Sequence, residues 1–161
     1  MSVRASIGLG GNLGDVRQRL EAAIGHLAAQ PGIVLAGCSR FYRTPPWGPV
    51  EQPDFVNAAI AVDTTLPPHA LLDVLLETER DFGRVRDGGR WGPRTLDLDL
   101  LLYGDLVLDD ARLSLPHPRM AERAFVLLPL ADLDPGLLVP GQGRVGDLLK
   151  VVETGECAVL P

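Results

Sequence analysis

The chain has 161 residues, of which 46% are hydrophobic and 22% charged, and its formal net charge at pH 7 is −6. This composition is that of an ordinary globular protein and fits a single domain, residues 1–161. The negative charge argues against a protein that binds nucleic acid through its whole surface. The sequence has no signal-like start and no apolar run that could cross a bilayer, so we expect a cytoplasmic protein without membrane contact. We also expect a monomer. The two cysteines, Cys38 and Cys157, have no ligand-like spacing and are expected to be free thiols.

The first half of the chain predicts a strand, a helix and two further strands. Alternating apolar residues at 3–9 indicate a half-buried strand that ends in a glycine-rich turn. Apolar residues at helical spacing then predict a helix that ends near residue 29, before a Pro-Gly pair. Further strands are expected at 33–42 and 55–62, and the proline-rich segment 44–53 between them is expected to be a loop.

The second half repeats the pattern with one helix and one strand. A Pro-Pro pair at 67–68 opens a helix that runs to about residue 82, with Gly83 just beyond its end. A basic loop follows at 84–93, and alternation predicts a strand at 95–103. Residues 106–108 are expected to pair back against that strand, and a helix is expected at 120–128. This order predicts an α+β fold with a ferredoxin-like β-α-β-β-α-β core, helices on one face of the sheet, and extra C-terminal strands and helices.

Two carboxylates stand two positions apart on the predicted strand at 95–103. Asp97 and Asp99 therefore point to the same face, with Cα atoms about 6.5–7 Å apart. Thr95 and Leu101 share this face, and the opposite row faces the core: Leu96, Leu98, Leu100 and Leu102. Two carboxylates together with substrate phosphates are a common Mg²⁺ site. The plainer alternative is a solvated strand face that happens to carry acids.

Arginines gather just before these acids. Five of the chain's fourteen arginines fall within fifteen positions: Arg80, Arg84, Arg86, Arg90 and Arg94. Guanidinium groups suit bidentate contacts to phosphate oxygens, so a basic patch on an acidic protein indicates a small anionic ligand. A solvated, arginine-rich loop is the competing explanation.

The string RWGPRTLDLDLL at 90–101 resembles the motif of the 6-hydroxymethyl-7,8-dihydropterin pyrophosphokinase family. Segments 41–46, 52–59, 83–86 and 116–117 resemble that family in the same order. The resemblance implies transfer of pyrophosphate from ATP to hydroxymethyldihydropterin in folate synthesis, with AMP as the leaving group. It also implies two Mg²⁺ ions held by the acid pair, and the net charge of −6 separately argues against a nucleic-acid partner.

The same resemblance assigns roles to individual residues. It places Arg84 and Arg94 on the transferring group and makes them catalytic with Asp97 and Asp99. The implied pterin contacts are Asn12, Thr44, Pro45, Pro46, Trp47, Phe55, Asn57, Trp91 and Phe125. The implied ATP contacts are Glu79, Arg86, Arg90, Trp91, Arg94, Leu100, Arg112, Leu113, Ser114, His117 and Arg123.

Several of these residues also have ordinary explanations. Phe55 and Phe125 are each typical of a core, and His117 between two prolines is typical of a turn. Glu79 fits a solvated helix face about as well as an ATP pocket. Asn57 is different, because an amide in the middle of an apolar strand is costly unless its partners are supplied.

Three other functions compete with this interpretation. The glycine run at 8–14 lacks both the third glycine of a dinucleotide motif and the Gly-Lys-Ser/Thr ending of a P-loop, so we interpret it as a turn in which Asn12 or Asp15 caps the helix. An RNA-binding module would share the element order, but acids on its open sheet would repel phosphates. A two-metal nucleotidyltransferase also suits the acid pair, and it would release pyrophosphate instead of AMP.

Overall fold

A computed structural model describes residues 1–46, 48–49, 51–83 and 95–161. Its helical segments are α1 Val16–Ala28, α2 Pro68–Asp81, the 3₁₀ turn η1 Met120–Glu122, α3 Ala124–Leu133 and α4 Val145–Leu149. Its strands are β1 Val3–Gly11, β2 Ile33–Cys38, β3 Tyr42–Thr44, β4 Phe55–Thr64, β5 Asp97–Tyr103, β6 Leu108–Asp109, β7 Ser114–Leu115, β8 Leu138–Val139, β9 Gly143–Arg144 and β10 Ala158–Val159.

The main sheet has the order β10-β3-β4-β1-β5, and β2 also pairs with β4. Every described pair in it is antiparallel. The prediction of one strand at 33–42 was wrong, because the chain breaks into β2 and β3. Ser39 lies at the break, where its hydroxyl accepts a hydrogen bond from the Ala59 N–H (2.9 Å) and donates one to the Arg40 carbonyl (2.7 Å). A serine side chain that takes over a ladder bond offers the backbone an alternative to the sheet.

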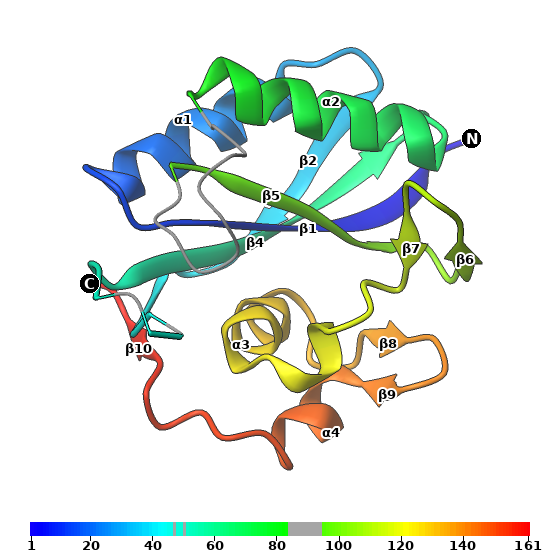
Figure 1. Cartoon of the computed structure of the whole chain (residues 1–161). Coiled ribbons are helices and arrows are strands. Elements are labelled where there is room, and N and C mark those ends of the chain that lie inside the picture. The colour runs from blue at the N-terminus through cyan, green and yellow to red at the C-terminus, as the bar shows by residue number, and fades with distance from the viewer. Residues whose placement is uncertain (47, 50, 84–94) are drawn as a thin grey trace.

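Helices cover both faces of the sheet (Figure 1). The first, larger core lies between the sheet and α1 with α2, and a second core lies under α3 on the opposite face. The prediction of helices on one face only was therefore wrong. The sequence pattern did not show which face of the sheet the helix after residue 120 covers, and this helix contributes Leu127 and Leu130 to the second core. It also begins later than expected, with η1 at Met120 and α3 running from Ala124 to Leu133.

A bulge interrupts the alternation of β5. Ile7 of β1 pairs with Leu100 and Ser6 pairs with Leu102, so Leu101 has no partner across the strand pair. Leu100 enters the first core, while Leu101 and Leu102 both enter the second. The prediction of one core-facing row of four leucines was thus wrong at Leu102, because an extra residue changes the face of everything beyond it.

The ends of the helices follow their sequence signals. The Asp15 carboxylate accepts a hydrogen bond from the Gln18 N–H (3.3 Å), which decides the cap of α1 in favour of Asp15. Helix α2 begins at Pro68 as expected, and Gly83 beyond it has a φ of +85° that glycine adopts without strain. The prediction that 106–108 pairs back on β5 was wrong, because β6 pairs with β7 in a separate hairpin.

The cysteine prediction is confirmed, since Cys38 and Cys157 are both free. Within the described ranges, none of the helices combines the length and the apolar character that crossing a bilayer requires.

Candidate active site

Predicted pterin and metal residues meet on the face of the sheet that α3 covers. Paired residues on antiparallel strands share a face, and Gly10 pairs with Asn57 of β4 and with Asp97 of β5. Two residues away on β1, Gly8 pairs with Asp99. The register therefore brings the amide and both carboxylates to one surface, where β1 lies between the strands that carry them.

Asn57 is held in a defined orientation. Its side chain is 9% exposed, and its Nδ2 donates to the Thr44 hydroxyl at 3.1 Å. A Cβ added at Gly10 would lie 2.5 Å from the Asn57 Oδ1, a distance that real contacts essentially never have. Gly10 thus leaves the space that the amide occupies. The sequence did not reveal this role, because the glycine sits in a run that is readily explained as a turn.

Asn12 fastens the proline-rich loop to the end of β1. It is 2% exposed, and its Nδ2 donates to the Gln52 Oε1 at 2.8 Å and to the Pro53 carbonyl at 2.9 Å. Pro45 and Pro46, in the same loop, are half-buried. The contribution of Gln52 was missed, although it belongs to the segment 52–59 that carries the family resemblance.

The acid pair stands at the start of β5. Asp97 is half-buried and Asp99 is exposed. In the described part of the chain, no three or more His, Cys, Asp or Glu side chains cluster in a way that would hold a metal by themselves. The donor set fits Mg²⁺, which binds carboxylate oxygens and retains positions for water or phosphate.

Glu79 lies beside this pair and is not solvated. It is 2% exposed on the last turn of α2, and its Oε2 accepts a hydrogen bond from the Leu98 N–H at 2.8 Å. Leu98 is the residue between the two acids. The alternative of a solvated helix face is therefore wrong for Glu79.

The predicted ATP contacts flank β5, which forms the edge of the described sheet. On the α2 side, the Arg112 guanidinium forms an ion pair with Asp73. The backbone N–H of Arg112 donates to the Asp110 carboxylate at 2.9 Å. That bond, with others from the neighbouring Leu113 N–H and from His69, holds the pKa of Asp110 below its usual value despite the opposing effect of burial.

On the α3 side, the His117 N–H donates to the Leu101 carbonyl at 2.9 Å. Burial lowers the pKa of His117, and the nearby positive charge of Arg123 lowers it further. The Arg123 guanidinium also lies 5.6 Å from the centre of the Phe125 ring, a cation–π contact. Residues predicted for the nucleotide and for the pterin thus touch each other at the start of α3.

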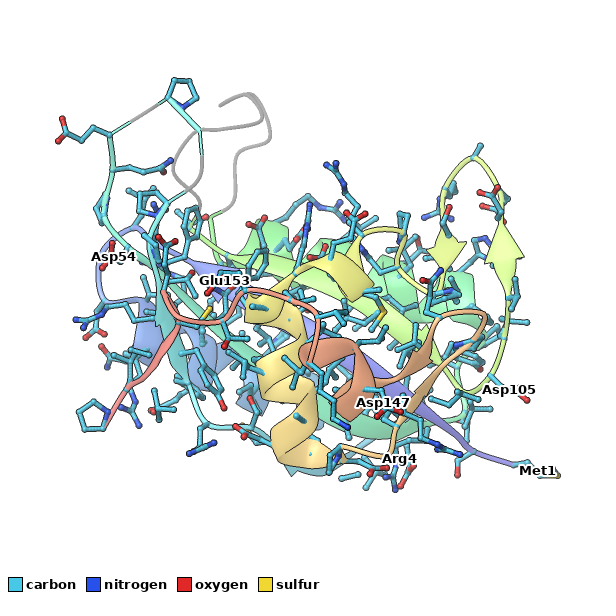
Figure 2. The ribbon with its side chains drawn as sticks, turned by 90° about the horizontal axis from the view of Figure 1, so that it is seen from below. Met1, Arg4, Asp54, Asp105, Asp147 and Glu153 are labelled. Carbon is cyan, nitrogen blue, oxygen red and sulfur yellow. The ribbon has the colours of Figure 1, made fainter. Side chains whose placement is uncertain are left out.

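The remaining predicted residues divide into two groups. Phe55 is half-buried on the same face as Asn57, Leu100 and Leu113 are core residues, and Ser114 donates to the Asp109 carboxylate at 2.9 Å. Figure 2 shows Asp54, next to Phe55, and Asp105, just beyond β5, at opposite ends of the molecule. The predictions that lie outside the described residues are Trp47, Arg84, Arg86, Arg90, Trp91 and Arg94.

Comparison with known proteins identifies the family. Residues 6–135 match the sequence model of 7,8-dihydro-6-hydroxymethylpterin-pyrophosphokinase (HPPK). The chain belongs to the HPPK family. The match includes the acid pair, Asn57 and the predicted contacts up to Phe125, and it ends shortly after α3.

Relatives of nearly equal length support this membership. The 2-amino-4-hydroxy-6-hydroxymethyldihydropteridine pyrophosphokinase of Methylorubrum extorquens is 52% identical over 152 residues, which cover 94% of this chain and 96% of the relative. The Pseudomonas aeruginosa protein of the same name is 48% identical and covers 92% of this chain, which in turn covers 91% of that protein.

Solved structures agree at the level of the fold. Wild-type Plasmodium falciparum HPPK-DHPS with pteroate superposes on 93% of this chain with a TM-score of 0.73 at 15% identity. The match covers 42% of the Plasmodium chain, so this HPPK-family chain corresponds to less than half of that protein.

Proposed function

We propose that the chain transfers a pyrophosphoryl group from ATP to 6-hydroxymethyl-7,8-dihydropterin, and that AMP and the pterin diphosphate are the products. Membership of the HPPK family supports this step of folate biosynthesis. The observation that carries the proposal within the chain is the register of β1. In this register the Asn57 amide, on β4, and the Asp97 and Asp99 carboxylates, on β5, lie on one surface, with β1 between the two strands.

Each side of this surface has chemistry suited to one substrate. The amide of Asn57 offers a donor and an acceptor to the hydrogen-bonding edge of a pterin, and Phe55 and Phe125 are the proposed aromatic faces for its ring. Asp97 and Asp99 are the proposed ligands of two Mg²⁺ ions. When bound, such ions neutralise the triphosphate and the charge that develops during transfer.

The remaining catalytic parts are proposals of the same kind. Arg84 and Arg94 are proposed to contact the transferring group, while Arg112, His117 and Arg123 contact the nucleotide. The hydroxymethyl oxygen attacks the β-phosphorus and loses its proton, while the bond between the β-phosphorus and the oxygen that bridges it to the α-phosphate breaks and AMP leaves. Positioning and charge neutralisation supply most of the catalysis, so no nucleophilic serine or cysteine is required.

Our proposal for the whole chain is one ferredoxin-like domain that acts as a cytoplasmic monomer. The sheet order β5-β1-β4-β2 and the two helices on one face support that topology. The extra segments are α3 with its core and the small hairpins beyond it.

The identity of the ATP-derived product tests the reaction. Purified protein supplied with Mg²⁺, ATP and hydroxymethyldihydropterin is expected to form AMP and the pterin diphosphate in equal amounts, as measured by anion-exchange chromatography. Formation of ADP would indicate an ordinary kinase. Release of pyrophosphate would indicate the nucleotidyltransferase alternative, and either result would refute the proposal.

Substitution of the acids tests the metal assignment. Asp97→Ala and Asp99→Ala are each expected to lower kcat by about 100-fold or more, because they remove charge that the transition state needs. Asp105→Ala is the matched control, since this exposed acid lies beyond the far end of the same strand. Activity within about twofold of wild type in either of the first two variants would contradict the assignment, provided that circular dichroism shows a native fold.

A further inference from the structure

The backbone of β5 between the two acids is bonded in an unusual way. Strand β5 pairs with β1 on one side only among the described elements, so its other edge presents N–H and C=O groups outward. The Leu98 N–H donates to Glu79 and therefore points away from β1. An N–H on a sheet edge is ordinarily satisfied by water, and here a buried side chain satisfies it instead.

Glu79 has an unusual location for an acid. It is 2% exposed, and the helix that carries it packs against β5. A carboxylate that is removed from water is costly unless hydrogen bonds compensate it. Its neighbour Thr78 is equally buried at 1% exposed, but the Thr78 hydroxyl donates to the Val74 carbonyl within α2 itself at 2.8 Å. The two buried polar residues thus differ in their bonds, since Glu79 joins the helix to the strand and the Thr78 bond stays within the helix.

The peptide group that is bonded to Glu79 influences the positions of both carboxylates. Asp97 and Asp99 flank Leu98, and the Leu98 N–H belongs to the peptide plane that joins Asp97 to Leu98. A rotation of this plane changes ψ of Asp97 and φ of Leu98, and it thereby redirects the chain that leads to Asp99. The side chains two positions apart on a strand share one face only while the backbone between them stays extended. A catalytic group that is displaced by about 1 Å can lose about 100-fold in rate.

We propose that Glu79 is a positioning residue that fixes the β5 backbone and thereby the spacing of the two acids. This role rests on the proposed function only in taking Asp97 and Asp99 as metal ligands. The hydrogen bond itself belongs to the protein without its substrates, and it is measurable there.

Amide hydrogen exchange of the ligand-free protein gives the first test. In Glu79→Ala, the Leu98 amide is expected to exchange about tenfold faster or more than in wild type, because it loses its hydrogen bond to the Glu79 side chain. The amide of Ile60, in the interior strand β4, is expected to keep its wild-type protection. Unchanged exchange at Leu98 would overturn the proposal.

The Mg²⁺ dependence of turnover gives the second test. Glu79→Ala is expected to raise the Mg²⁺ concentration for half-maximal rate about tenfold and to change the KM for the pterin less than twofold. Glu79→Gln keeps an acceptor oxygen and is expected to restore both the exchange protection and the Mg²⁺ midpoint to within about threefold of wild type. An unshifted midpoint in Glu79→Ala would overturn the role in positioning.

Thr78→Val is the matched control for a merely structural effect. It removes a buried polar group one position away, and it is expected to move neither Leu98 exchange nor the Mg²⁺ midpoint. An equal shift in this control would overturn the specific role of Glu79. If Glu79→Ala does not fold, Glu79→Asp, which is one methylene too short for the bond, takes its place in both tests. A wild-type protein that forms no AMP would refute the proposed function, and the exchange experiment would still decide on the hydrogen bond.

Discussion

Gly10 and Asn57 show how one missing side chain shapes the site. The Asn57 Oδ1 occupies the space that a Cβ at position 10 would fill, while its Nδ2 is held by Thr44. Because Thr44 holds one end of the amide and the backbone of Gly10 lies against the other, its donor and acceptor keep one arrangement. An amide that is oriented in advance loses less conformational freedom when a ligand binds.

Replacement of Gly10 tests this arrangement. Gly10→Ala is expected to displace the Asn57 side chain and to raise the KM for the pterin about tenfold, which corresponds to about 1.4 kcal/mol. The KM for ATP is expected to stay within about twofold, because the displaced group belongs to the pterin side. Steady-state kinetics with each substrate varied in turn measures both values.

Gly25→Ala provides the control, because Gly25 does not leave space for another side chain. Gly25 lies within α1 and an added Cβ meets nothing within 4 Å. Its replacement is expected to leave both KM values unchanged and to raise the free energy of unfolding by about 0.5–1 kcal/mol, because alanine favours the helix. A pterin KM that rises equally in the two variants would contradict the role given to Gly10.

At the scale of elements, Asp132 joins α3 to the break between β2 and β3. Its carboxylate accepts hydrogen bonds from the Arg40 guanidinium (2.8 Å), the Arg40 N–H (3.1 Å) and the Tyr42 hydroxyl (2.9 Å). Burial opposes ionisation of this carboxyl, but the hydrogen bonds from Arg40 and Tyr42 prevail and lower the pKa of Asp132. Since β3 continues to Thr44, this junction also supports the residue that holds Asn57.

The pH dependence of stability reports on this junction. The pKa of Asp132 is lower in the folded protein than its ordinary 3.8, so its contribution is complete above pH 3.8 and is lost as the pH falls through the folded-state value. Asp132→Asn is expected to lower the free energy of unfolding by about 2 kcal/mol at pH 7. The difference from wild type is expected to shrink below about pH 3.8, as measured by urea titration at several pH values.

An exposed acid of similar chemistry serves as the comparison. Asp147 pairs with Lys150, and both side chains are at least 70% exposed. Asp147→Asn is therefore expected to change the free energy of unfolding by less than about 0.5 kcal/mol at any pH in the series. A pH-independent loss in Asp132→Asn would contradict the explanation by ionisation.

At the scale of the whole molecule, the two cores share one sheet. Strand β5 contributes Leu98 and Leu100 to the first core and Leu101 to the second, so neither layer is expected to unfold without disturbing the other. The candidate site is built on strands that belong to both. Ligands bound there are expected to stabilise the entire chain.

Thermal unfolding with and without ligand tests this coupling. A non-hydrolysable ATP analogue with Mg²⁺, at about 100 times its dissociation constant, is expected to raise the free energy of unfolding by about 2.7 kcal/mol in a single transition. Removal of Mg²⁺ by EDTA is expected to abolish most of the gain, and so is Asp97→Ala. Two separate transitions would refute the coupling of the two cores. A gain in stability that survives EDTA would refute the metal assignment.

The sequence predicted local features better than the way in which they combine. The strands at 3–9, 55–62 and 95–103, the start of α2 and the shared face of Asp97 and Asp99 follow from periodicity and proline chemistry, and the structure agrees with them. The second core and the burial of Glu79 depend on contacts between distant segments, which periodicity does not contain. The same holds for the space that Gly10 leaves, since it is defined by a residue on another strand.

The bulge at Leu101 bears on how related sequences are aligned. Directly after Asp99, three consecutive positions of β5 are almost fully buried, at 3%, 1% and 3% exposure for Leu100, Leu101 and Leu102. All three are buried because both faces of the sheet are covered, and the bulge decides only that Leu102 joins Leu101 in the second core. An alignment that opens a gap between Asp99 and Tyr103 would exchange the residues of the two layers. A relative that keeps this bulge is therefore expected to keep the same number of residues between the second acid and Tyr103, so that its counterpart of Leu102 stays in the second core.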